Sequence, residues 1–112
     1  MLQSGWFLRG AETREFESEF AAWTKAPHCV LVANGYDALR LTLRAWISLR
    51  RLEVGDEVVV PANSFIASAL AVTDAGLQVR LADVEPATFN LSAATVAAAV
   101  VASRRQTPMT DR

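Results

Sequence analysis

The chain has few of the side chains from which catalytic and metal-binding sites are most often built. Its 112 residues include a single cysteine, Cys29, a single histidine, His28, and, beside ten arginines, a single lysine, Lys25. One cysteine excludes an internal disulfide and a four-thiolate metal centre, and one histidine excludes a histidine-rich metal centre. We therefore predict no metal site.

Net charge and long apolar runs are also lacking. The formal net charge of -1 gives no electrostatic reason for binding nucleic acid or an acidic membrane surface. The apolar run Val96–Ala102 is much shorter than the roughly 20 residues that a membrane span requires. Met1–Gly10 does not show the basic and then apolar pattern of a secretory signal. We expect a cytoplasmic protein with no nucleic-acid partner and no membrane association.

Hydrophobic residues, by contrast, are plentiful. They make up 52% of the chain, against an ordinary share of about 45–50%. This composition excludes intrinsic disorder as the default state, since disorder requires low hydrophobicity and high net charge. The length corresponds to one domain at most, and it suffices for a buried core.

Short β-branched runs alternate with longer segments of helical period. Repeated strand–helix–strand units with apolar strands are typical of an α/β protein with a parallel sheet, which is the fold class we predict. Gly76 stands where a left-handed residue ends a helix, and Ser92 where a side chain caps one. Helices are predicted at residues 12–23, 36–51, 64–75 and 92–102, and strands at 28–33, 57–60 and 78–83.

The first candidate site is the Asn34-Gly35 turn between a predicted strand and a predicted helix. The backbone N–H groups of Gly35, Tyr36 and Asp37 have no partner within such a helix, and with the helix dipole they suit a phosphate. The Asp37 carboxylate could occupy the same position in place of a ligand. Neither a GxGxxG nor a GxxxxGK[ST] motif is present. The junction alone favours an ordinary strand–helix turn over an anion site.

The second candidate site is the segment Pro61–Phe65, at the carboxyl end of a predicted strand, where open α/β sheets collect ligands. The Phe65 ring could stack on a planar ligand ring. It could equally belong to the core, continuous with Ile66 and Leu70. Spacing alone favours the core interpretation.

Five segments together resemble the DegT/StrS-type sugar aminotransferases, which depend on pyridoxal phosphate (PLP). They cover nearly the whole chain in the family's order and spacing, and the combination is highly specific. The resemblance implies a truncated, partial large domain of the fold-type I PLP-dependent transferases. Residues 1–103 would form its N-terminal part and residues 104–112 an irregular tail. The segments are SGWFLRG (4–10), EFESEFAAW (15–23), VANGYDALRLTLRA (32–45), GDEVVVPANSFIASALAVTDAG (55–76) and LADVEPATFNL (81–91).

The resemblance also implies roles for five residues. Backbone groups of Gly35 and Tyr36 would hold the cofactor phosphate, the Phe65 ring would stack on the pyridine ring, and Trp6 and Phe7 would lie near the substrate. The full-length family transfers an amino group from an amino donor to a nucleotide-linked keto-sugar, for polysaccharide or antibiotic sugars, and usually acts as a homodimer. The motifs are most similar to those of members that aminate position 3 of 6-deoxy keto-sugars.

Two groups that transamination needs are not found in this sequence. One is the lysine amine that holds the cofactor and moves a proton, and the other is the carboxylate that keeps the pyridine nitrogen protonated. Lys25 matches no such lysine, and we predict no catalytic residue among the 112 and no activity for the chain alone. The alternatives are a non-catalytic protein that pairs with a full-length homologue and a free-standing phosphate-binding module.

The resemblance has a structural consequence as well. In this fold family, strands that come later in the sequence separate the first strand from the second and third. Residues 28–33 would therefore have no native partner, and the edges of the other strands would be open to other chains. We expect the isolated chain to be marginally stable or to pair its strands in a non-native way.

Overall fold

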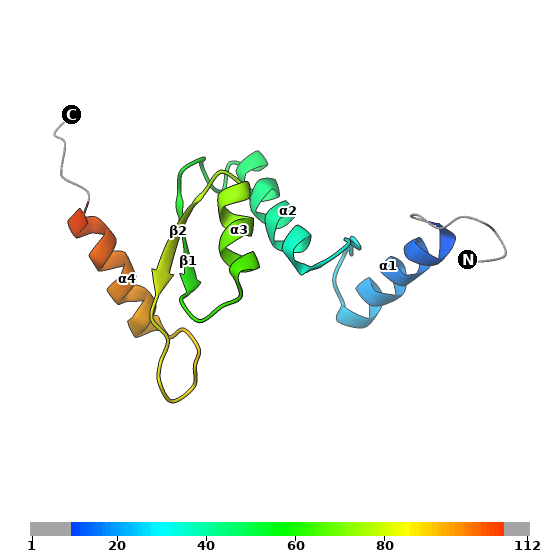
Figure 1. Ribbon diagram of the computed structural model, residues 1–112. Helices are drawn as coiled ribbons and strands as arrows, with labels where there is room; N and C mark the ends of the chain where they lie inside the picture. The colour runs from blue at the N-terminus through cyan, green and yellow to red at the C-terminus, as the bar shows by residue number, and fades with distance from the viewer. Residues whose placement is uncertain (1–9, 107–112) are drawn as a thin grey trace. The chain divides into compact units, whose positions relative to one another are not determined.

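The computed structural model describes residues 10–106, with side chains up to residue 101. These residues form two compact units that divide between Ala33 and Asn34. The first unit contains α1 (Ala11–Thr24). The second contains, in chain order, α2 (Gly35–Ser48), β1 (Glu57–Pro61), α3 (Ile66–Asp74), β2 (Gln78–Ala82) and α4 (Ala93–Gln106), which are labelled in Figure 1. No helix in the described range is long and apolar enough to cross a membrane.

In the first unit, α1 carries a stripe of aromatic side chains. Phe16 and Phe20 stack with ring centroids 5.7 Å apart, and Trp23 lies 5.6 Å from Phe20. The helix predicted at residues 12–23 is confirmed, and its three aromatic side chains lie along one face. All three aromatic side chains are exposed, and Trp23 keeps 78% of its surface accessible. Lys25 ends the helix in the left-handed region, at φ 56°, and its N–H bonds to the carbonyls of Ala21 and Ala22.

The predicted strand at residues 28–33 is wrong: this segment has no regular secondary structure. A strand needs a neighbour for its N–H and C=O groups, and no described strand pairs with it. The N–H of Leu31 instead donates to the Glu17 carboxylate, at 2.7 Å. The apolar composition of the segment indicates strand propensity, but propensity does not supply a neighbouring strand to pair with.

In the second unit, β1 and β2 form a parallel pair with Glu57 opposite Gln78 and Pro61 opposite Ala82. The α3 helix is the crossover between them, so the predicted α/β class and the parallel pairing are confirmed. Gly76, at φ 87°, makes the left-handed turn predicted after α3. An ion pair between Glu57 of β1 and Arg80 of β2 crosses the two strands.

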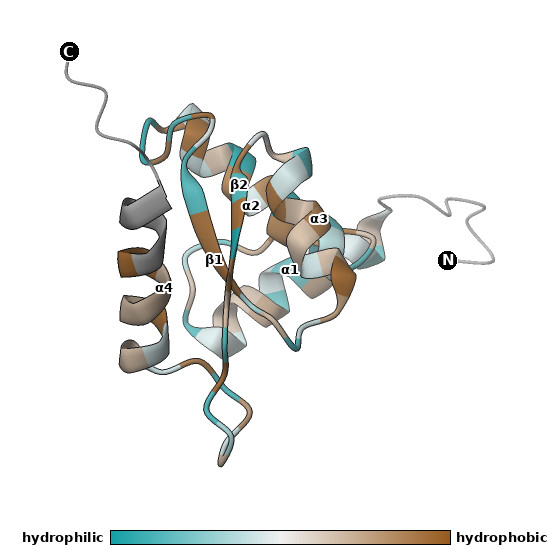
Figure 2. Ribbon diagram, turned by 60° about the vertical axis from the view of Figure 1, so that its left-hand side comes forward, coloured by the Kyte–Doolittle hydropathy of each residue, from teal (hydrophilic) through white to brown (hydrophobic). Residues whose placement is uncertain are grey.

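The core of this unit lies between the strands and the helices α2 and α3. Its buried residues are Val60, Val72, Ala75 and Leu77, and half-buried side chains of α2 and of both strands surround them. The core is small, because six hydrophobic residues of this unit are buried among those described. Figure 2 shows the hydrophobic segments along both strands. Packing therefore joins β1, α3, β2 and α2, and this cluster positions the candidate sites.

The topology brings helix starts and strand ends together at the carboxyl end of the sheet. Both parallel strands end there, and α3 and α4 begin there, as Figure 1 shows. Ser92 caps α4 as predicted, since its Oγ accepts from the N–H of Thr95 at 3.3 Å. The α4 helix continues to Gln106, four residues past the predicted end at 102.

One edge of β1 is open, and an apolar groove of about 390 Å³ runs beside it. Leu39 and Trp46 of α2 line the groove together with residues 58–61 of β1 and Val72 of α3. The unpaired edge of a β-branched strand beside apolar side chains is a template for pairing with another chain.

We expect Val72→Ala to lower the free energy of unfolding by about 2 kcal/mol, because it removes buried methyl groups and leaves a void. Val72 is 3% exposed, whereas Val54 is 75% exposed, which makes Val54→Ala the matched control. Urea denaturation followed by far-ultraviolet circular dichroism measures both. An equal effect of the two substitutions would contradict the described core.

We expect the purified chain to self-associate as its concentration rises, since the open β1 edge and the groove offer unpaired backbone and apolar surface. Sedimentation velocity over a hundredfold concentration range measures this. A monomer at all concentrations that also melts in one sharp transition would contradict the expectation.

Candidate functional site

The first turn of α2 presents backbone N–H groups without internal partners. Asn34 is the N-cap: its backbone is extended, and its Oδ1 accepts from the N–H of Asp37 at 2.9 Å. The helical ladder begins with the N–H of Ala38, which donates to the Asn34 carbonyl at 3.1 Å. Within the described residues, the N–H groups of Gly35 and Tyr36 find no acceptor. Two such donors at the positive end of a helix dipole suit an anion.

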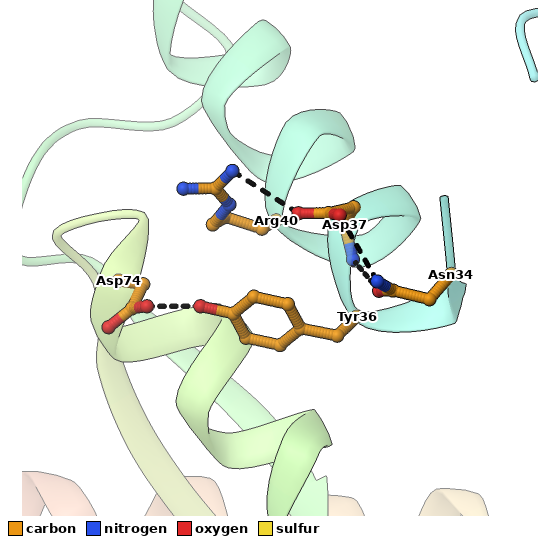
Figure 3. A network of polar contacts seen from close by, with 5 residues as sticks. All are labelled: Asn34, Tyr36, Asp37, Arg40 and Asp74. Carbon is orange, nitrogen blue, oxygen red and sulfur yellow. Dashed lines mark hydrogen bonds and ion pairs between the residues drawn. The ribbon is translucent and has the colours of Figure 1, made fainter. Parts of the chain in front are cut away.

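The Asp37 carboxylate is bound by other side chains and does not accept from the N–H groups of Gly35 and Tyr36. Its N–H is occupied by the Asn34 cap, so two of the three predicted donors remain. Its carboxylate accepts from Arg40 at 3.2 Å and from Asn34 Nδ2 at 3.2 Å (Figure 3). The negative charge of Asp37 is thus paired with the guanidinium of Arg40, which reduces its repulsion of a phosphate at the same turn.

The space beside Gly35 is open. A Cβ built on Gly35 would meet no atom within 4 Å, so a ligand can approach the backbone there. Backbone donors, a helix N-terminus and open space together suit a phosphate group. This geometry is compatible with a phosphate contact at the Asn34-Gly35 junction, which stays a prediction.

Phe65 is exposed, and the core interpretation that spacing favoured is wrong. It is the N-cap of α3 and keeps 79% of its surface accessible. Its neighbours on the sequence pattern, Ile66 and Leu70, are also exposed, by 61% and 47%. In α3 only Ala71 and Val72 are buried, and within its own unit the helix contacts α2 and both strands. The Phe65 ring is therefore accessible to a ligand.

The loop that carries Phe65 is held by side-chain hydrogen bonds. Asn63 Nδ2 donates to the carbonyl of Phe89 at 3.2 Å, which links the loop after β1 to the loop after β2. The hydroxyls of Ser64 and Ser68 are 2.8 Å apart across the first turn of α3. Phe89 is 70% exposed and has a left-handed backbone at φ 55°. The hydrogen bond from Asn63 joins residues 26 positions apart, so no local sequence pattern predicts it.

The Tyr36 side chain turns toward α3. Its hydroxyl donates to the carboxylate of Asp74, in the last turn of α3, and the Arg40 guanidinium lies 5.8 Å from the centre of its ring (Figure 3). The hydrogen bond to Asp74 raises the pKa of Tyr36 above its ordinary value, and partial desolvation adds to the shift. Only the backbone N–H of Tyr36 is left for a ligand at the helix terminus.

The remaining polar residues do not form a second such site. Trp6 and Phe7 lie outside the described residues. Lys25 is an exposed residue at the end of α1. In the first unit, His28 and Cys29 line a polar pocket of about 220 Å³. Across residues 10–101, no three histidine, cysteine or acidic side chains gather in a way that could hold a metal ion.

The sequence model of the DegT/DnrJ/EryC1/StrS aminotransferase family matches residues 1–107. The chain belongs to this family. The resemblance read from the motifs is therefore confirmed.

Two curated relatives show how much of a longer protein the chain matches. The chain is 42% identical over 91 residues to a dTDP-3-amino-3,6-dideoxy-alpha-D-galactopyranose transaminase of Aneurinibacillus thermoaerophilus, covering 81% of the chain and 24% of that protein. It is 49% identical over 76 residues to the erythromycin biosynthesis sensory transduction protein EryC1 of Saccharopolyspora erythraea, covering 68% of the chain and 20% of that protein. The chain thus spans about a quarter of the length of these relatives or less.

Solved structures agree with this placement. A putative sugar aminotransferase from Streptococcus pneumoniae matches with a TM-score of 0.72 and 34% identity, over 88% of this chain and 24% of that one. A GDP-4-keto-6-deoxymannose-3-dehydratase with a trapped PLP-glutamate geminal diamine matches with a TM-score of 0.67 and 30% identity, over 75% of this chain and 22% of that one. The fold is part of the fold-type I domain of PLP-dependent enzymes.

We expect Asn34→Ala to lower the free energy of unfolding by about 1 kcal/mol, because the first turn of α2 loses its cap. Asn34→Asp is the matched variant, since its carboxylate oxygen can accept from the same N–H and should retain most of that stability. Thermal denaturation followed at the helical band measures the order. Equal loss in both variants would show that the side chain does not act as a cap.

Proposed function

We propose that this chain provides the N-terminal part of the large domain, residues 1–103, of a PLP-dependent aminotransferase acting on nucleotide-linked keto-sugars. Residues 104–112 would lie beyond that part. The observation that carries the proposal is the pair of N–H groups, of Gly35 and Tyr36, that stand without acceptors in the described residues at the open start of α2. Their chemistry fits the phosphate group of PLP.

The residues present here would do two things for the cofactor. The N–H groups of Gly35 and Tyr36 would bind its phosphate, and the exposed ring of Phe65 would stack on and orient its pyridine ring. When bound, PLP supplies an electron sink for the reacting carbon of the substrate. Trp6 and Phe7 remain proposed contacts to the sugar.

The chain alone is proposed to be inactive. Transamination needs an amine that can hold the cofactor and pass a proton, and the one lysine of this sequence, Lys25, is exposed at the end of α1. Activity would therefore depend on polypeptide corresponding to the rest of the family's length. An amino donor, a keto-sugar carried on a nucleotide, a homodimer and a cytoplasmic location belong to this proposal for the complete enzyme.

Binding of PLP to the purified chain tests the proposed cofactor site. We expect the chain to bind PLP more tightly than pyridoxal, which lacks the phosphate, when quenching of tryptophan fluorescence is measured. Phe65→Ala should weaken PLP binding about fivefold through loss of ring stacking, and Phe65→Tyr should retain it. Phe89→Ala is the control, since Phe89 is a comparably exposed aromatic residue on the neighbouring loop.

Two results would contradict the proposed site and the proposed inactivity separately. Equal binding of PLP and pyridoxal would show that the N–H donors do not hold the cofactor phosphate. An unchanged affinity in Phe65→Ala would show that the Phe65 ring does not stack on the cofactor. A PLP adduct that borohydride fixes onto Lys25, together with transfer of an amino group, would show that the chain carries its own catalytic amine.

A second candidate function is that of a non-catalytic protein that pairs with a full-length homologue. The open β1 edge and the apolar groove beside it favour this reading. Co-expression with a tagged full-length relative tests it. Co-purification that is lost on substitution of Val59 by lysine supports pairing through β1, and independent purification of the two chains argues against it.

A further inference from the structure

The Tyr36 hydroxyl joins two helices that carry different parts of the proposed cofactor site. Tyr36 lies in the first turn of α2, where the N–H donors are, and Asp74 lies in the last turn of α3, the helix that Phe65 caps. The two residues are 38 positions apart in the sequence. Figure 3 shows the tyrosine ring extending from α2 to α3. One side-chain contact thus links the helix of the phosphate donors to the helix of the stacking ring.

The surroundings of Tyr36 hold its ring in this orientation. Arg40, one turn along α2, lies over the ring at 5.8 Å and is itself paired with Asp37 at 3.2 Å. Asp37 in turn accepts from the Asn34 cap. The charged groups that face Tyr36 are therefore Arg40 and Asp37 on α2 and Asp74 on α3. This network runs from the N-cap of α2 to the end of α3, and a positive charge stands between its two carboxylates.

We propose that Tyr36 is a positioning residue which, through its hydrogen bond to Asp74, fixes the first turn of α2 relative to α3. The N–H donors are thereby placed for the phosphate group of PLP when the pyridine ring of that cofactor stacks on Phe65. This inference rests on the proposed function, and it assigns the Tyr36 hydroxyl a partner in the protein. A direct bond from that hydroxyl to the phosphate would require Tyr36 to leave Asp74.

The contact predicts a specific pH dependence. Because Asp74 raises the pKa of Tyr36, the folded state holds the phenolic proton more tightly than the unfolded chain does. The stabilisation is fully present below the ordinary tyrosine pKa of about 10. It is lost as the pH rises through the raised pKa of the folded state.

Tyr36 is the only tyrosine of the chain, so its titration can be followed directly by tyrosinate absorbance in the near ultraviolet. In the unaltered chain, Tyr36 should ionise above the ordinary tyrosine pKa. Asp74→Asn should move the midpoint toward that value. Asp83→Asn, at an exposed aspartate after β2, should leave it unchanged. An unchanged midpoint in Asp74→Asn would overturn the contact.

PLP binding tests the positioning role. Tyr36→Phe and Asp74→Ala should each weaken PLP binding about threefold, and the double variant should be no weaker than either single one, because both remove the same hydrogen bond. Pyridoxal binding should change less. Circular dichroism of each variant checks that the helices are retained.

Three results would overturn the positioning role, and they are distinguishable. Loss of affinity in Tyr36→Phe with none in Asp74→Ala would assign the hydroxyl to the phosphate itself. Unchanged affinity in both variants would make the contact structural only. Absence of PLP binding by the unaltered chain would refute the proposed function and the positioning role together, while the titration would still decide whether the contact exists.

Discussion

The parallel pairing of β1 with β2 is the constraint on which the rest of the second unit depends. Two parallel strands require a crossover, and α3 supplies it on one side of the sheet. The pairing buries Val60 of β1 and Leu77 before β2 against Val72 of α3 and Ala75, which caps that helix, with α2 packed beside them. The candidate site follows from this packing, because it fixes α3 and, through Tyr36 and Asp74, the first turn of α2.

The same constraint explains what the unit leaves exposed. A two-stranded sheet has two edges, and the apolar groove lies beside the edge of β1. Phe65, Ile66 and Leu70 of the α3 region are exposed, although a complete domain of this class has helices on both faces of its sheet. These surfaces accord with a chain that spans about a quarter of its relatives' length. The groups proposed to bind a phosphate and a pyridine ring, at Gly35, Tyr36 and Phe65, all lie within this unit.

The sequence predicted the elements whose cause is local, and it missed those that depend on distant partners. The cap at Ser92 and the turn at Gly76 follow from a few adjacent residues. Residues 28–33 have the composition of a strand but no partner, which composition alone cannot show. Phe65 reads as core by spacing, because spacing does not tell which face of α3 is covered. The Tyr36–Asp74 contact joins residues too far apart for any local pattern to reveal.

The central claim is that this chain contributes backbone N–H donors for the cofactor phosphate and a ring that stacks on the cofactor. It contributes no amine that bonds covalently to the cofactor. Amide chemical shifts recorded by nuclear magnetic resonance during titration with PLP test it most directly. The account predicts shifts at the amides of Gly35 and Tyr36 and at the ring of Phe65, with little change at the capped amide of Asp37. Shifts confined to the neighbourhood of Lys25 would contradict it.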